Sequence, residues 1–253
     1  MQGYRQFCPV ALGAEVFAER WTPLILRELL LGSHRFSELR RGLPRISRNL
    51  LTQRLASLER AGLIKRRRRS NGHGFDYSLT PAGEELRPVV TALGTWGYKW
   101  AATELRPDNL DAGLLMWFLR RRVRVENLPE PRVVTRFDFH AQGARSFWLE
   151  GQQSFWLILE RPVVDLCLSD PGFEVDLTAN AGVAELTRVY LGHLSLMQAI
   201  RQGSVEIVGR RELRSGFRDW IGVSPFAHTK SSASSVADDL PKHSPSSSSA
   251  RQA

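Results

Sequence analysis

The sequence of 253 residues has little cysteine and no long apolar run, and each shortage excludes a class of protein. Its two cysteines, Cys8 and Cys167, can form neither a disulfide framework nor a zinc site. The longest uncharged apolar stretches, such as 189–200, reach about a dozen residues, whereas a transmembrane helix needs roughly eighteen. The first ten residues show no charged start followed by an apolar core, which argues against a secretory signal. We therefore expect a cytoplasmic protein without membrane contact.

Motifs for catalysis and cofactor binding are also missing. The six histidines are scattered, and none stands at metal-ligand spacing from a carboxylate or a cysteine. No nucleophile elbow, phosphate-binding loop or dinucleotide-binding glycine motif stands in a strand–turn–helix context. The sequence therefore predicts a protein that is not an enzyme and that uses no cofactor or metal.

Positive charge is abundant and unevenly distributed. The net charge is +9, and residues 1–104 carry 17 Lys and Arg against 9 Asp and Glu, a net of +8. The remaining 18 basic and 17 acidic residues leave a net of +1 for residues 105–253. This asymmetry indicates that the first part of the chain meets a polyanion.

The chain divides into three segments and is predicted to be α+β overall. Residues 1–104 are mostly helical with one hairpin, whereas residues 108–226 mix helices with short strands. Residues 227–253 include nine serines and almost no apolar side chain, which predicts a disordered tail.

Helix signals order the first segment. Periodicity predicts a helix over 10–19, Thr22 and Pro23 look like a cap and a first helical residue, and a short helix covers 36–41. Ser47 caps a longer helix that reaches about residue 61. A basic hairpin follows around 70–74, and a helix that starts at 80–81 and is kinked by Pro88 closes the segment.

A short helix, a turn, a longer helix and a basic hairpin make a winged helix-turn-helix, in which the longer helix enters the major groove of DNA. The outward side chains near its start can reach base edges, and the hairpin cations can lie along phosphates. The alternative is an ordinary solvated helix face and a solubilising charge run. The candidate DNA-binding residues are Ser47, Arg48, Asn49, Thr52, Gln53, Arg54, Lys65, Arg66, Arg67, Arg68 and Arg69.

Several motifs in this segment resemble the HxlR family of transcription regulators, relatives of MarR. They are 8–10 (CPV), 20–29 (RWTPLILREL), 35–39 (RFSEL), 46–55, 58–64 (LERAGLI) and 77–83 (YSLTPAG). The resemblance covers about 5–100 and implies a homodimer on near-palindromic promoter DNA, paired through the first and last helices of the segment. It implies Leu93, Trp96 and Trp100 at the dimer interface, the alternative for the two tryptophans being burial in their own domain. It also makes Cys8 a candidate oxidant sensor, the alternative being an inert thiol.

The second segment contains alternating strands and an amphipathic helix. Strands are predicted at 132–139, 146–149, 154–160, 163–168 and 173–178, antiparallel and with helices on one side, and a helix is predicted over 184–202. The motifs 170–177 (DPGFEVDL), 191–194 (LGHL), 199–203 (AIRQG) and 209–225 resemble the sterol-carrier-protein-like fold, which holds apolar ligands between sheet and helices. The apolar faces of the strands and the helix, together with this resemblance, make seven residues candidates for binding an apolar effector, the alternative being plain core: Phe137, Phe139, Phe155, Leu157, Tyr190, Leu194 and Met197.

The sequence thus predicts a dimeric regulator of transcription that binds operator DNA and responds to an apolar small molecule. Two alternatives remain for the second segment: a dimerisation module without a ligand, or a lipid-binding carrier domain that is not coupled to DNA binding.

Overall fold

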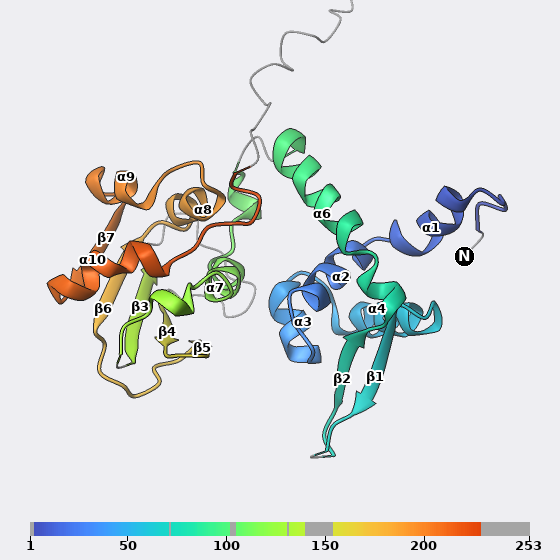
Figure 1. Ribbon diagram of the computed structural model, residues 1–253, viewed down its shortest axis with the longest axis horizontal. Helices are drawn as coiled ribbons and strands as arrows, with labels where there is room; N and C mark the ends of the chain where they lie inside the picture. Colours follow the sequence, from blue (N-terminus) through green and yellow to red (C-terminus); the bar gives the residue numbers. More distant parts are fainter. Residues whose placement is uncertain (1–2, 71, 102–104, 131, 140–153, 229–253) are drawn as a thin grey trace, which may run out of the picture.

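The computed structural model describes residues 3–70, 72–101, 105–130, 132–139 and 154–228, which form two domains (Figure 1). The strand predicted at 146–149 and all but two residues of the predicted tail lie outside the described residues. No helix within the described ranges is long and apolar enough to cross a membrane.

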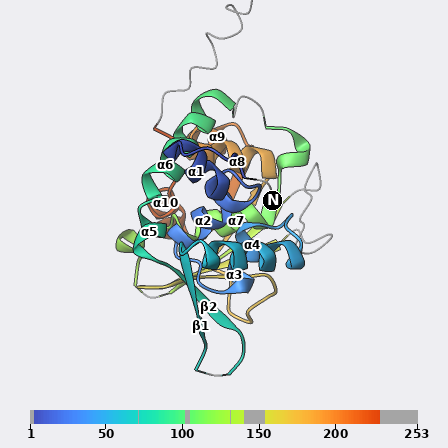
Figure 2. The same ribbon diagram turned by 90° about the vertical axis from the view of Figure 1, so that its right-hand side faces the viewer.

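The N-terminal domain has the winged helix-turn-helix arrangement that the sequence predicts. Its helices and strands, in chain order, are α1 (Pro9–Phe17), α2 (Thr22–Leu30), α3 (Phe36–Gly42), α4 (Arg48–Arg60), β1 (Ile64–Arg68), β2 (Phe75–Leu79), α5 (Pro81–Glu84) and α6 (Arg87–Trp96). A π-helical turn, η1 (Gly97–Ala101), extends α6. Buried leucines and isoleucines of α2, α3 and α4 form the core. The β1–β2 hairpin projects away from the body in both views (Figure 1, Figure 2).

Two helix boundaries in this domain differ from expectation. Thr22 is not the cap of α2, because it is the buried first residue of the helix and Trp21 precedes it with a left-handed φ of 79°. Pro88 does not kink a continuous helix. The chain instead ends α5 at Glu84 and starts α6 at Arg87, so Pro88 occupies the first turn, where its missing N–H removes no helical hydrogen bond.

The C-terminal domain is a five-stranded sheet covered by helices on one face. After η2 (Pro107–Asn109) come α7 (Ala112–Arg120), η3 (Val125–Asn127), β3 (Val133–Phe139), β4 (Ser154–Leu159), β5 (Val164–Cys167), β6 (Leu177–Ala181), α8 (Val183–Leu191), α9 (Leu196–Arg201), β7 (Val205–Gly209) and α10 (Arg211–Trp220). The strand order is β5-β4-β3-β6-β7. Alternate residues of β3 and β4 face the helices and are buried, as predicted.

Three expectations for this domain were wrong in detail. The sheet is not wholly antiparallel, because the chain passes through β4 and β5 before β6 joins β3 in parallel. The strand predicted at 173–178 begins at Leu177. The helix predicted over 184–202 is two helices, since Gly192 ends α8 with a φ of 79° and Ser195 caps α9.

Candidate nucleic-acid interface

The second helix of the helix-turn-helix presents a polar face beside a buried one. Leu51, Leu55 and Leu58 of α4 are buried in the domain core. The Ser47 side chain accepts a hydrogen bond from the Leu50 N–H at 3.2 Å, so the predicted cap is confirmed. The exposed face of the first two turns carries four of the predicted DNA-binding residues, namely Arg48, Asn49, Thr52 and Gln53.

Arg54, predicted with them, is engaged inside the domain. Its guanidinium pairs with Glu19, and its Nε donates to the Arg20 carbonyl at 3.1 Å. The side chain therefore ties α4 to the connection between α1 and α2. Unlike its four neighbours, it is mostly covered.

The hairpin divides its cations into two groups. Arg66 pairs with Glu59 of α4 at 3.2 Å and lies over the Phe75 ring, and Arg69 pairs with Asp76 at 3.7 Å. The other three cations are exposed and form no ion pair with a carboxylate of the described residues: Lys65, Arg67 and Arg68. These three are the hairpin cations with charge available to a phosphate.

The connection between α2 and α3 fixes the hairpin in place. The Tyr77 N–H donates to the His34 carbonyl at 2.7 Å, and the His34 N–H donates to Glu38 at 2.8 Å. Glu38 also accepts from the Arg35 N–H at 3.0 Å, which caps α3. A surface groove of about 700 Å³ lies between this connection and the hairpin, and Arg35, Lys65 and Arg67 line it.

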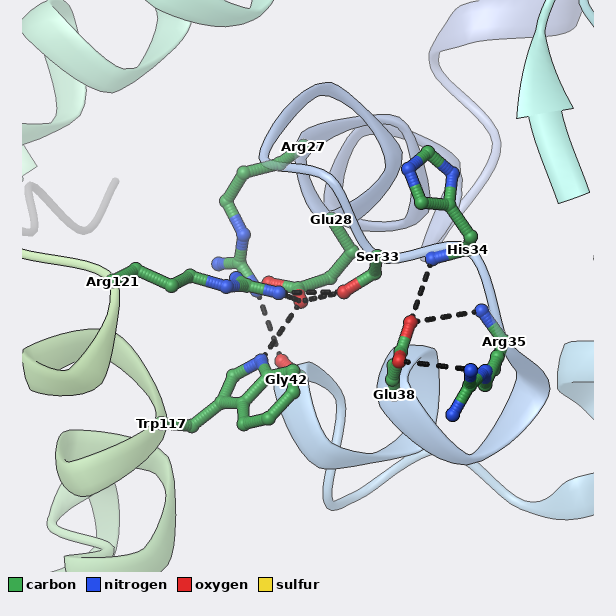
Figure 3. A network of polar contacts seen from close by, with 9 residues as sticks. All are labelled: Arg27, Glu28, Ser33, His34, Arg35, Glu38, Gly42, Trp117 and Arg121. Carbon is green, nitrogen blue, oxygen red and sulfur yellow. Dashed lines mark hydrogen bonds and ion pairs between the residues drawn. The ribbon is translucent and has the colours of Figure 1, made fainter. Parts of the chain in front are cut away.

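A buried carboxylate joins the helix-turn-helix to the second domain (Figure 3). Glu28 of α2 is 0% exposed and accepts hydrogen bonds from Arg27 at 3.0 Å and Ser33 at 3.1 Å. It also accepts the Trp117 indole N–H of α7 at 3.1 Å and the guanidinium of Arg121, the residue that ends α7 as its C-cap, at 2.9 Å. We call these five residues the Glu28 network.

Close packing surrounds the Glu28 network. A Cβ placed on Gly42 of α3 would lie 1.9 Å from the Glu28 carboxyl carbon, so only glycine fits there. Arg27 donates to the Gly42 carbonyl at 2.9 Å. Burial lowers the pKa of Arg27, and the neighbouring Glu28 carboxylate opposes that shift. The guanidinium carbon of Arg121 lies 4.6 Å from the Trp117 ring centroid.

A second contact joins the domains at the last helix of the N-terminal domain. The Tyr98 hydroxyl donates to the Leu191 carbonyl of α8 at 2.8 Å. Phe226 packs against Gly94 of α6, where an added Cβ would lie 2.3 Å from the ring. The helix-turn-helix formed by α2, α3 and α4 is called the reading head. The C-terminal domain thus contacts the reading head at α2 and α3, and it also contacts α6.

Neither α1 nor α6 has a buried residue. The predicted interface residue Leu93 is exposed, Trp96 is 59% exposed and Trp100 is 40% exposed. Other exposed apolar side chains lie in or beside the same helices: Phe7, Val10, Leu12 and Val89. A groove of about 690 Å³ between Arg87 and Trp100 is lined by both tryptophans. The expected alternative, burial within their own domain, does not hold for these two rings.

The predicted effector-binding residues do not form one pocket. Phe137, Phe139, Phe155 and Leu157 lie in the domain core, where Phe139 and Phe155 pack edge to face with ring centroids 5.8 Å apart. Tyr190 and Leu194 are half-buried at the core margin, and Met197 is 43% exposed on α9.

The two cysteines lie far apart in the sequence and differ in setting. Cys8 is the residue that precedes α1 and is partly buried. Cys167 ends β5, where burial raises the pKa of its thiol. A raised pKa keeps Cys167 in the unreactive thiol form.

Sequence reasoning missed the Glu28 network. Trp117 and Arg121 stand 89 and 93 residues from Glu28, and a glutamate inside a helix carries no local sign of burial. A weak signal was present in the apolar positions on either side of Glu28, which place it on the inner face of α2.

Comparison with known proteins shows that the N-terminal domain is similar to a family of transcriptional regulators. A profile of the HxlR-like helix-turn-helix family matches residues 16–105. The uncharacterized HTH-type transcriptional regulator YvaP of Bacillus subtilis is 35% identical over 97 residues, which are 38% of this chain and 90% of that protein. YtfH of Escherichia coli, a further uncharacterized HTH-type transcriptional regulator, is 38% identical over 95 residues, which are 37% of this chain and 75% of that protein. The structure of the transcriptional regulator YodB from B. subtilis in its reduced form is 27% identical, covers 40% of this chain and 100% of that one, and has a TM-score of 0.34.

Proposed function

This chain belongs to the HxlR-like helix-turn-helix family of DNA-binding transcriptional regulators, and we propose that it reads a promoter operator as a homodimer. The observation that carries the proposal is the exposed polar face of α4 next to the unpaired hairpin cations. Together they offer base-reading side chains and phosphate-neutralising charge on neighbouring elements.

Each group of residues has a separate task in this proposal. The start of α4 enters the major groove, where Arg48 suits guanine and Asn49 or Gln53 suits adenine. The amides at the Ser47 cap favour a phosphate oxygen at the helix N-terminus. Lys65, Arg67 and Arg68 lie along the backbone and release counterions, which gives affinity without sequence preference.

The exposed apolar faces of α1 and α6 support pairing with a second copy of the chain. A single winged helix reads one half-site, whereas two related by a twofold axis read a near-palindrome. Burying Leu93, Trp96 and Trp100 against a partner removes their apolar surface from water. The half-site centres are then about 10 base pairs apart, or a multiple of that.

Control by an effector in the C-terminal domain is the second part of the proposal. Its support is that this domain contacts both parts that set the reading geometry: α2 through Glu28, and α6 with its extension η1 through Phe226 and Tyr98. An effector that prefers one domain arrangement shifts DNA affinity by its preference. The sterol-carrier-like resemblance of this domain belongs to the same proposal, and a ligand-free dimerisation module or an uncoupled lipid carrier are its competitors. Oxidant sensing by Cys8 stays a separate prediction.

Binding assays with an operator selected from random duplexes test the reading of DNA. Arg48→Ala should weaken operator binding by about 1–3 kcal/mol and leave binding to random duplex nearly unchanged. Arg68→Ala should weaken binding to the operator and to random duplex alike. The slope of the logarithm of affinity against the logarithm of salt concentration should fall by about one, because one phosphate contact is lost. Arg60→Ala, at the far end of α4, is the matched control and should change neither. Equal losses on operator and random DNA in Arg48→Ala would contradict the proposal.

A further inference from the structure

An open groove lies where α9, β7 and α10 meet in the C-terminal domain. Its volume is about 460 Å³, within the range of about 300–1,000 Å³ that small-molecule sites occupy. Apolar side chains from all three elements line it, namely Met197 and Ile200 of α9, Ile207 of β7 and Phe217 of α10.

The same groove is rimmed by arginines from one face of α10. Arg211, Arg214 and Arg218 are spaced three and four residues apart, so their guanidinium groups are neighbours on the helix surface. All three are exposed. Like charges at this spacing destabilise a helix unless an anion lies between them.

The described part of the chain supplies little counter-charge to this rim. Arg218 lies 3.5 Å from Asp219, and Arg210, just outside the groove, pairs with Asp176 at 2.6 Å. Neither Arg211 nor Arg214 forms an ion pair with a carboxylate of the described residues. Two cations therefore stand free at the edge of an apolar surface.

We propose that this groove binds an amphipathic anion, a long-chain carboxylate whose tail lies on the apolar floor and whose head meets Arg211 and Arg214. The planar guanidinium donates two parallel hydrogen bonds to a carboxylate, which fixes the head more firmly than a lysine would. The inference rests on the proposed effector control for its biological role, and it narrows the effector from an apolar molecule to an anionic one.

A continuous set of contacts connects the groove to the DNA-reading head. Phe217 of the groove wall packs against Trp220, with ring centroids 6.4 Å apart. The Trp220 carbonyl accepts from the Arg124 N–H at 2.8 Å, just beyond α7. Since Arg121 at the end of α7 binds Glu28, a shift of α10 reaches α2 through packed and hydrogen-bonded groups.

Calorimetric titration of the full chain with decanoate tests the site, with decanol and acetate as the matched neutral and tailless probes. Decanoate should bind best, because it alone meets both the floor and the rim. The double substitution Arg211→Gln, Arg214→Gln should weaken decanoate binding about tenfold or more, since charge-assisted hydrogen bonds are lost. The same variant should leave decanol binding unchanged. Arg201→Gln, an exposed arginine of α9 that does not line the groove, is the control and should bind decanoate like the parent.

Three results would overturn the site. The first two are no binding of decanoate, and an equal loss of decanoate affinity in the double variant and in Arg201→Gln. A third is a lower affinity of the double variant for random duplex with a flatter salt dependence, because the arginines would then be phosphate contacts. Met197→Gln replaces one of the apolar side chains that line the groove, and it should weaken the binding of decanoate and of decanol to the same extent. If decanoate binds as expected and operator affinity does not change, the groove stands and effector control fails.

Discussion

Replacing Glu28 by glutamine is the sharpest test of how the two domains are held together. The carboxylate accepts from Arg27 at one oxygen and from Ser33, Trp117 and Arg121 at the other. An amide keeps one acceptor, turns the other position into a donor, and leaves two partly buried guanidinium groups without their buried counter-charge. Breaking a buried ion pair from one side costs about 3–5 kcal/mol, and we expect the unfolding free energy to fall by that amount.

The matched control is an ion pair that is shorter and exposed. Arg87 and Glu84 lie 2.6 Å apart on the surface, with both side chains about half exposed. Glu84→Gln should cost less than about 1 kcal/mol, because water screens the pair and solvates the remaining arginine. Burial rather than distance thus decides the difference between the two variants.

Urea unfolding at a fixed protomer concentration, followed by tryptophan fluorescence, measures both losses. A fixed concentration is needed because dimerisation adds to apparent stability. Combining Glu28→Gln with Arg121→Met gives the pairwise coupling, expected at about 0.5–3 kcal/mol for residues in one network. A loss in Glu28→Gln no larger than in Glu84→Gln, or a coupling near zero, would refute the reasoning.

Two further predictions concern α6. Trp100→Ala should shift the protein from dimer to monomer in sedimentation at micromolar concentration, whereas Phe173→Ala, at an equally exposed ring of the C-terminal domain, should keep the dimer mass; a dimeric Trp100→Ala would count against the pairing surface. Gly94→Ala should cost about 1–3 kcal/mol in thermal unfolding, since its Cβ would lie 2.3 Å from the Phe226 ring. The control Gly13→Ala in α1 meets no atom within 4 Å and should be neutral or stabilising, and equal effects of the two would contradict the packing.

Local signals were enough to predict most of the N-terminal domain. The Ser47 cap, the apolar stripe from Leu51 to Leu58 and the glycine-rich hairpin turn each act within a few residues, so the sequence shows them directly. The kink predicted at Pro88 is wrong because a proline at this place is compatible with two structures. A proline can kink a long helix or begin a new one, and the contacts that decide between them are not local.

The C-terminal domain was less predictable because its decisive pairings are distant. Alternation correctly placed Phe137 and Leu157 on the buried face, yet it could not show that β6 crosses to the far side of β3 and pairs in parallel. The predicted effector residues share an apolar face, and an apolar face is usually core. Four of the seven are core residues, whereas the groove combines Met197 with arginines from α10 that no apolar pattern selects.

The two interdomain contacts differ in strength, and this limits how an effector could act. The Glu28 network joins the α7 region to α2 through charged hydrogen bonds around a fully buried carboxylate. The other contact consists of one hydrogen bond from the Tyr98 hydroxyl to α8 and the packing of Phe226 on Gly94 of α6. A neutral hydrogen bond contributes about 0.5–1.5 kcal/mol, and a coupling between two binding sites is typically about 1–3 kcal/mol. An effector with ordinary coupling can therefore break the Tyr98 hydrogen bond and let Phe226 slide on Gly94, but it cannot break the Glu28 network. The C-terminal domain and its own reading head would then stay joined as one unit through the Glu28 network. The orientation of this unit relative to α6 would change. In a dimer paired through α6, such a change alters the distance between the two α4 helices, which is the quantity that operator spacing measures.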